Sequence, residues 1–188
     1  MQIEKEVRYQ IDEEQIDKII LNTTPYKEKI EMLDITCGYK GFDSYSLYGF
    51  ICRVRQKGNK KTLEVKNYLN PNECTEQEIK LENIEDGINY LKLIGMKPYL
   101  YLKRFREVRK YKDLKIFIDE FDILGNYVEI EYQDSIDSKK NINEFLNLIN
   151  IKKIPLDMYG SIVKEKLEHD LEFKKVFNKK LEKVLTKK

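Results

Sequence analysis

Residues 3–11 read IEKEVRYQI, and their side chains alternate with the period of two that is typical of a β-strand. The two faces of this strand carry Ile3, Lys5, Val7 and Tyr9 on one side and Glu4, Glu6 and Arg8 on the other. A sheet edge that faces water would explain one such charged face. Whether a different explanation is needed depends on whether other strands repeat the pattern.

Arg104 and Arg106 are likewise two residues apart in 103–108 (KRFREV), and the pattern recurs in 51–55 (ICRVR), 62–66 (TLEVK), 75–81 (TEQEIKL) and 128–132 (VEIEY). Their charged faces carry Arg53 and Arg55, then Glu64 and Lys66, then Glu76 and Glu78, and finally Glu129 and Glu131. A sheet with one wet face is one interpretation of this repetition. However, water-facing positions also accept Ser, Thr, Asn and Gln, so repeated pairs of Glu or Arg indicate specific roles. We favour a closed barrel with a charged interior, whose apolar outer face is covered by helices.

The overall charge excludes some classes of protein. Lys and Arg number 35 against 33 Asp and Glu in 188 residues, which argues against a general nucleic-acid binder. No apolar run reaches the length of a membrane span and no signal-peptide pattern opens the chain, so we expect a cytoplasmic protein that binds neither nucleic acid nor membrane. The three cysteines lack CxxC spacing, which argues against a zinc site or a disulfide framework. The single His169 lies in a charged tail and gives no support to a histidine triad.

Helical patterns separate the groups of strands. A first helix is predicted after Asp12, an N-cap with Gln15 three residues later. Further helices are predicted in 84–95, in 138–150 and from about residue 161. The pattern shows about seven strands, and an eighth is expected within 34–49. We therefore predict an α+β, mostly β fold in a single domain, residues 1–188, with a lysine-rich helical extension at about 166–188 whose end is frayed and solvated.

An interior lined by both arginines and glutamates suits a particular ligand. Arg and Lys form charge-assisted contacts with phosphate oxygens, whereas clustered carboxylates repel one another unless a hard divalent cation lies between them. Mg²⁺ takes a few carboxylates together with substrate phosphates. The number of charged positions exceeds what a monophosphate needs and is suited to a linear triphosphate.

The spacing of these residues is similar to that of a known family. The signature that resembles the CYTH superfamily of triphosphate tunnel metalloenzymes consists of Glu4-x-Glu6-x-Arg8, Arg53-x-Arg55, Lys66, Glu76-x-Glu78, Arg104-x-Arg106, Asp119 and Glu129-x-Glu131. That superfamily includes class IV adenylyl cyclases, thiamine triphosphatases and inorganic tripolyphosphatases. The resemblance covers roughly residues 1–165 and includes Tyr159, which resembles the start of the family's closing helix. It implies a closed eight-stranded antiparallel β-barrel, the triphosphate tunnel, with helices packed outside.

The resemblance also implies a role for each signature residue. Mg²⁺ or Mn²⁺ would be held by Glu4, Glu6, Glu129 and Glu131. Catalytic roles would fall to Glu4, Glu6, Glu78 and Asp119. Triphosphate would be bound by Arg8, Arg53, Arg55, Lys66, Arg104 and Arg106.

The chain departs from the family pattern at three places. Arg8 stands where Lys is commoner, Cys74 stands where many relatives have Arg, and the segment 34–49 lacks the usual aspartate-aromatic strand. These departures concern the places where an organic group would be recognised more than the phosphate site.

The resemblance therefore leaves three functions open. The first is a divalent-metal-dependent hydrolase of a small-molecule triphosphate, either inorganic tripolyphosphate or an organic or nucleoside triphosphate, in a monomer or homodimer. The second is a class IV adenylyl cyclase that forms cyclic AMP and pyrophosphate from ATP. The third is a non-catalytic module that binds polyphosphate or nucleotides. We place the hydrolase first, because water needs less positioning than a ribose hydroxyl.

Overall fold

The computed structural model describes residues 3–44, 46, 49–70, 73–133, 135–156 and 158–186, without the side chains of residues 3, 4, 68–70 and 73. The strands are β1 (Ile3–Ile11), β2 (Thr24–Gly38), β3 (Phe50–Lys57), β4 (Lys60–Asn70), β5 (Glu73–Lys80), β6 (Lys97–Tyr111), β7 (Leu114–Phe121) and β8 (Gly125–Tyr132). The α-helices are α1 (Glu13–Asn22), α3 (Ile84–Leu93), α4 (Ile136–Leu148), α5 (Tyr159–His169) and α6 (Leu171–Leu185), and a short 3-10 helix, η1, spans Gly41–Asp43. The predicted mostly β, α+β fold with eight antiparallel strands is confirmed.

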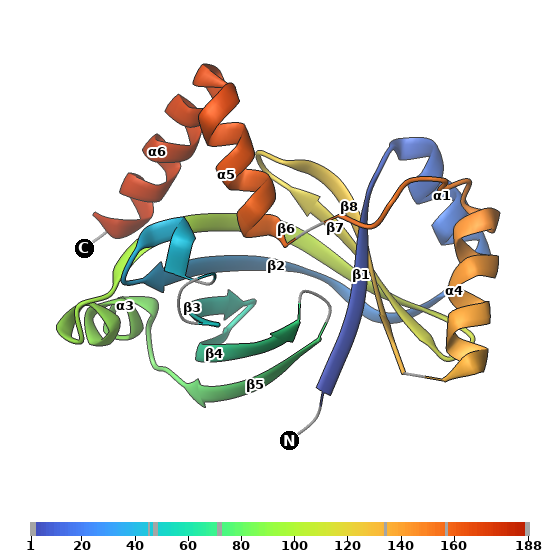
Figure 1. Cartoon of the computed structure of the whole chain (residues 1–188), viewed down its shortest axis with the longest axis horizontal. Coiled ribbons are helices and arrows are strands. Elements are labelled where there is room, and N and C mark those ends of the chain that lie inside the picture. Colours follow the sequence, from blue (N-terminus) through green and yellow to red (C-terminus); the bar gives the residue numbers. More distant parts are fainter. Residues whose placement is uncertain are drawn as a thin grey trace.

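The strands surround an interior (Figure 1). The hydrogen-bonded order is β1-β5-β4-β3-β2-β6-β7-β8, and β1 pairs with both β5 and β8. The pairing of β1 with β5 covers residues 3–5, whereas its pairing with β8 covers residues 5–11. The hairpin between β3 and β4 turns at Gly58, whose φ of 56° lies in the left-handed region that glycine tolerates.

The helices cover the apolar outer face of the barrel in two groups (Figure 1). On one side, α1 and α4 pack against β1, β7 and β8, and Phe145 and Ile19 are fully buried there. On the other side, α3, α5 and α6 pack against β2, β3 and β6, with Phe177 at the centre of the α6 contact. Each such side chain contributes about 1.5–3 kcal/mol of burial free energy. The hydrophobic core therefore lies between the barrel and its helices, which leaves the barrel interior to polar groups.

The capping residues explain where two of the helices begin. Asp12 and Gln15 form the predicted capping box: the backbone N–H of Gln15 donates to Asp12 Oδ1 (2.8 Å), and the backbone N–H of Asp12 donates to the Gln15 side chain (3.1 Å). Asp170 accepts from the backbone N–H of Phe173 (2.9 Å) and thereby starts α6. The C-terminal segment is thus two helices, where the sequence pattern predicts one.

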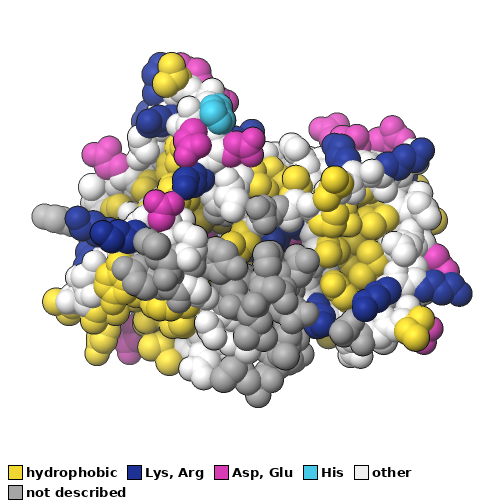
Figure 2. All heavy atoms as spheres, in the orientation of Figure 1, with side chains coloured by type: hydrophobic (Ala, Val, Ile, Leu, Met, Phe, Trp, Pro, Cys, Tyr) yellow, Lys and Arg dark blue, Asp and Glu magenta, His cyan; other side chains and the backbone are white. Residues whose placement is uncertain are grey.

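The lysine-rich C-terminal extension is helical, and one side of α6 packs against the barrel while most of its lysines are exposed. Phe173 and Phe177 are buried against the barrel, and Lys180 forms an ion pair with Asp122 (2.5 Å). The predicted start near residue 161 is two residues late, because α5 begins at Tyr159. His169 is exposed, as expected, and its side chain is cyan at the top of this helical hairpin in Figure 2.

The eighth strand also differs from its prediction. Gly38 ends β2, so only the first residues of the predicted interval 34–49 belong to a strand, which begins ten residues earlier at Thr24. The first half of β2 is exposed and lacks apolar alternation. It is nevertheless a strand, because its main chain pairs with β6, with shifts in register. Cys37, Cys52 and Cys74 are all buried, and none of them is in a disulfide bond. In the part of the chain that the structure describes, every helix is too short or too polar to span a bilayer.

Candidate functional site

A cavity of about 430 Å³ occupies the barrel interior. Every strand contributes to its wall, and so do η1 and α5. The charged side chains in the wall are Glu6, Arg8, Asp34, Asp43, Arg53, Arg55, Lys66, Glu76, Arg104, Arg106, Glu129, Glu131 and Lys164. The repeated charged faces of the strands therefore point inward, as the barrel interpretation predicts.

The strand register brings the signature residues together. Glu6 lies opposite Glu131 and Arg8 opposite Glu129 on β1 and β8, so all four side chains share one face. Lys66 on β4 lies opposite Glu76 on β5, and its ammonium is 2.9 Å from the Glu76 carboxylate. Pairs that are distant in the sequence thus become neighbours through backbone pairing alone.

Asp34 on β2 is the centre of a first group of ion pairs. Its side chain is 1% exposed and accepts two hydrogen bonds from Arg55 (2.6 and 3.0 Å) and one from Arg104 (2.8 Å). Burial alone would raise the pKa of Asp34, but the guanidinium groups of Arg55, Arg104 and Arg53 hold that pKa well below its ordinary value. Asp34 therefore carries its negative charge in the midst of three arginines.

Glu129 and Asp119 form a second group. The guanidinium of Arg106 donates to both carboxylates, and its Nε lies 2.6 Å from Asp119 Oδ1. The Nε of Arg8 donates to Glu129 (3.3 Å), and the hydroxyl of Tyr159 donates to Asp119 (3.3 Å). Burial raises the pKa of Glu129, but the charges of Arg106, Arg8 and Arg104 outweigh this effect and lower that pKa. Burial, together with Glu129 and Asp119, raises the pKa of Tyr159, which keeps its hydroxyl protonated as a donor.

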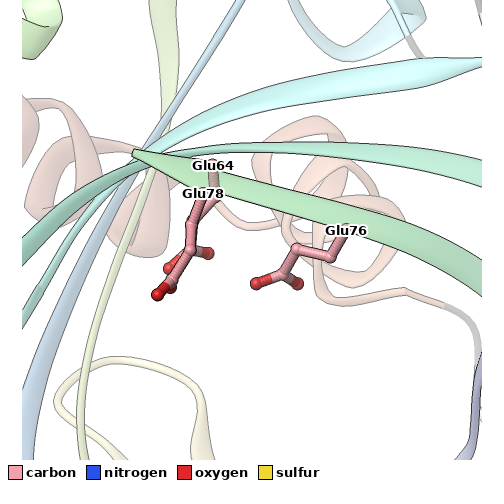
Figure 3. A group of neighbouring side chains, drawn as sticks. All are labelled: Glu64, Glu76 and Glu78. Carbon is pink, nitrogen blue, oxygen red and sulfur yellow. The ribbon is translucent and has the colours of Figure 1, made fainter. Parts of the chain in front are cut away.

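A third group consists of carboxylates from β4 and β5. Figure 3 shows the side chains of Glu64, Glu76 and Glu78 pointing the same way from these two strands, and their oxygen atoms lie within 4.8 Å of one another. Glu64 is 2% exposed and accepts from Arg53 (2.9 Å), whereas Glu78 is half exposed and paired with Lys60 (2.5 Å). Burial raises the pKa of Glu64, and Arg53 and Arg55 outweigh that effect and lower it.

Most of the predicted site residues line the cavity, and two whose side chains the structure describes, Asp119 and Glu78, do not. Asp119 lies directly behind the wall, where it contacts Arg104, Arg106 and Tyr159. Glu78 lies outside the lining residues, beside Lys60 at the end of β4. Glu4 in β1 lies opposite Cys74 in β5, and the side chain of Glu4 is outside the described part of the chain.

The site-residue prediction missed two buried carboxylates. Asp34 and Glu64 both hold arginines of the cavity wall, although neither was assigned a site role from the sequence. Glu64 lies between Thr62 and Lys66 on the inward face of β4, so the alternation of residues along this strand could have predicted that Glu64 points inward. Asp34 lies two residues from Thr36 on the inward face of β2, in a strand whose start the pattern did not reveal.

The donor chemistry of the cavity fits a hard divalent cation. Glu6, Glu129 and Glu131 supply only carboxylate oxygens from adjacent strands, which are the ligands that Mg²⁺ and Mn²⁺ prefer. Glu64, Glu76 and Glu78 are a second carboxylate group of the same chemistry. Each group is next to the arginines and Lys66, so a cation and phosphate oxygens could be held together.

Acid is expected to destabilise the fold through Asp34 and Glu64. The pKa values of both carboxyl groups are lower in the folded state than in the unfolded state. Their contribution to the stability of the fold is therefore complete when the pH is above their unfolded-state pKa values of about 4, and it is lost as the pH falls through the lower folded-state pKa values. We expect the free energy of unfolding, measured with urea by circular dichroism, to decrease steeply below about pH 4. Asp34→Asn should reduce this slope, whereas Glu28→Gln at an exposed position should leave it unchanged. An unchanged slope in Asp34→Asn would contradict the assignment.

Comparisons with known proteins agree with this fold. Similar structures include PH1819 from Pyrococcus horikoshii OT3 (TM-score 0.70, 21% identity, 87% of this chain and 99% of that one). A putative adenylate cyclase from Bacillus halodurans has a TM-score of 0.65 and 16% identity over 91% of this chain and 100% of that one. A Hippeastrum protein described as a putative adenylyl cyclase with a dominant triphosphatase activity has a TM-score of 0.59 and 13% identity over 80% and 89% of the two chains. At these identities the likeness shows the fold alone.

A sequence comparison defines the family. No curated protein has a significant match to the chain. Residues 49–155, more than half of the chain, match the family model of the CYTH domain. The matched segment includes Arg53, Arg55, Lys66, Arg104 and Arg106 of the cavity wall. This chain therefore belongs to the CYTH family.

Proposed function

We propose that the chain is a divalent-metal-dependent hydrolase of a triphosphate, which it binds in the barrel interior as in a tunnel. The observation that supports this most strongly is the composition of the cavity wall, in which five arginines and Lys66 face carboxylates of β1, β5 and β8. An anion with charge distributed along its length matches such a wall better than a compact anion does.

The arginines supply the binding groups for phosphate oxygens. Arg53, Arg55, Arg104 and Arg106 each have several N–H donors, and their internal ion pairs use only part of them. Asp34 and Asp119 hold these guanidinium groups in fixed orientations, so little reorganisation is needed when phosphate binds. Because the guanidinium groups remain charged, they stabilise negative charge on the leaving phosphate chain.

The carboxylates would hold the metal. Glu6, Glu129 and Glu131 are our first choice, together with Glu4, because they share one face of β1 and β8. The Glu64, Glu76 and Glu78 group is the second choice. When bound, a divalent cation would neutralise phosphate charge and lower the pKa of the attacking water. Asp119, held by Arg106 and Tyr159, orients the neighbouring arginine next to this position.

A cyclase is the second candidate, and one observation favours it. The rings of Phe42 and Tyr99 lie edge to face, with 5.0 Å between their centroids, in the cavity wall, to which Ile51 also contributes. This apolar area could contact a nucleobase. A cyclase must also align a ribose hydroxyl with the α-phosphate, whereas hydrolysis needs only water and a held phosphate chain. We therefore place hydrolysis first.

A product assay with purified protein tests both candidates. Tripolyphosphate, ATP and thiamine triphosphate are incubated with Mg²⁺, with Mn²⁺ or with a chelator, and orthophosphate, pyrophosphate and cyclic AMP are measured separately. We expect orthophosphate release that requires the metal, with little cyclic AMP. Equal amounts of cyclic AMP and pyrophosphate from ATP would establish the cyclase instead. Absence of turnover on all three substrates would contradict both candidates.

A further inference from the structure

A second cavity lies outside the barrel, between the barrel wall and the C-terminal half of α6. Its volume is about 600 Å³, compared with about 430 Å³ for the cavity in the barrel interior. Small-molecule sites in proteins have volumes of this order. Outward-facing residues of β2 and β6, the turn after β3 and the last turns of α6 form its wall, and we call this cavity the outer groove.

The outer groove and the barrel interior lie on opposite faces of β6. Tyr101, Lys103 and Phe105 line the outer groove, whereas Leu102 and Arg104, which alternate with them, line the interior. A ligand in the outer groove would therefore contact the reverse side of the strand that presents Arg104 to the interior. The outer groove is thus a separate site from the one proposed for triphosphate.

Both sides of the outer groove offer apolar surface. The Phe105 side chain on β6 is 44% exposed, although it is a large aromatic group. Leu33 on β2 and Val184 on α6 also line the groove and are half-buried. The hydroxyl of Tyr101 donates to Asp122 (2.9 Å), so the polar group of Tyr101 is already paired. An apolar ligand would remove this surface from water, which is favourable in proportion to the area covered.

The charges of the outer groove do not balance. Its three lysines face two carboxylates: Lys103 lies 2.9 Å from Glu31, and Lys180 lies 2.5 Å from Asp122. Among the residues that the structure describes, Lys183 has no carboxylate at ion-pair distance. One positive charge therefore remains beside the apolar surface, and it would attract a ligand with a single negative charge.

We propose that the outer groove binds an apolar monocarboxylate, a molecule of the fatty-acid type. Its chain would cover Phe105, Leu33 and Val184, and its carboxylate would lie next to the ammonium of Lys183. A bare phosphate would leave the apolar surface uncovered, and an uncharged hydrocarbon would leave Lys183 unpaired. This inference goes beyond the proposed function and does not depend on it.

The test uses octanoate, a soluble carboxylate of this class, and 1-octanol, its uncharged counterpart. Each is titrated into isotopically labelled protein, and the Kd is obtained by NMR from the shifts of the backbone amide resonances. We expect saturable shifts at Phe105 and Val184. Because Phe105 supplies apolar area, Phe105→Ser should raise the Kd of both ligands about tenfold. Lys183→Gln should raise the Kd of octanoate about three- to fivefold, since an exposed ion pair contributes little, and should leave that of 1-octanol unchanged.

The matched controls lie outside the outer groove. They are Lys179→Gln, at an exposed position on the same helix, and Tyr26→Ser, at an aromatic side chain on β2 that is 46% exposed. Neither should change a Kd, and tripolyphosphate should not displace octanoate. Equal effects of the control variants, displacement by tripolyphosphate or the absence of saturable shifts would each overturn this inference. None of these results would decide the proposed function, which the product assay tests separately.

Discussion

Glu131→Gln is expected to lower the proposed triphosphate hydrolysis by about a hundredfold or more, because loss of a carboxylate that we propose to bind the metal should cost at least as much as loss of a residue that only supports a ligand. Glu131 lies in the cavity wall opposite Glu6, and its carboxylate is one of three on the β1 and β8 face among the side chains that the structure describes. Its ion-pair partner, Lys115, is partly exposed, so the fold should tolerate the change. Steady-state kinetics over a range of Mg²⁺ concentrations measure the effect.

The control for this experiment is Glu120→Gln, a half-exposed strand glutamate that pairs with Lys29. It should leave both turnover and the Mg²⁺ dependence unchanged. Circular dichroism spectra and melting temperatures of the two variants should match those of the unmodified protein. Full activity of Glu131→Gln would remove this residue from the metal site and would favour the Glu64, Glu76 and Glu78 group.

Arg106→Ala is expected to destabilise the fold by about 3–5 kcal/mol, because it leaves two buried carboxylates without their shared partner. Asp119 is fully buried and Glu129 is 5% exposed, and both accept hydrogen bonds from the Arg106 guanidinium. Binding of triphosphate should also weaken, since Arg106 lines the cavity. The free energy of unfolding in urea, measured without phosphate, separates the structural effect from the binding effect.

Two further variants sharpen this prediction. Lys97→Ala, an exposed change on the same strand, should have almost no effect on stability. Adding Asp119→Asn to Arg106→Ala should cost less than the sum of the two single changes, because the double variant removes one of the uncompensated charges. Strict additivity of the two changes would show that Arg106 and Asp119 do not interact as the geometry indicates.

The alternation of residues along the strands predicted which side chains point inward, but not where each of them lies along the barrel axis. Because the side-chain period of a strand is two, the inward faces of Glu6, Arg53 and Glu129 follow from the sequence. Glu78 shares the inward parity of Glu76, yet it lies beside Lys60 outside the cavity wall, since parity does not specify position along the barrel axis.

Other features depend on contacts between distant segments and could not be predicted from local patterns. The exposed start of β2 is a strand because β6 pairs with it, and its sequence shows little alternation of its own. The apolar positions near the C-terminus fit one long helix, but the Asp170 side chain caps a new one there. The role of Asp34 becomes visible only when β2, β3 and β6 are neighbours, since Arg55 and Arg104 come from the other two strands.

The pairing of β1 with β8 also constrains the order in which the chain can fold. Residues 5–11 take their hydrogen-bond partners from residues 126–132, so the first strand is synthesised long before its neighbour exists. Until then its row of N–H and C=O groups is open, which is the condition in which strand edges associate between chains. Contacts of such large sequence separation also slow folding, because a long loop must close before they can form. The alternating Glu and Arg of β1 therefore also protect the nascent chain from aggregation. Charged strand edges resist pairing with other chains during the time before β8 is synthesised.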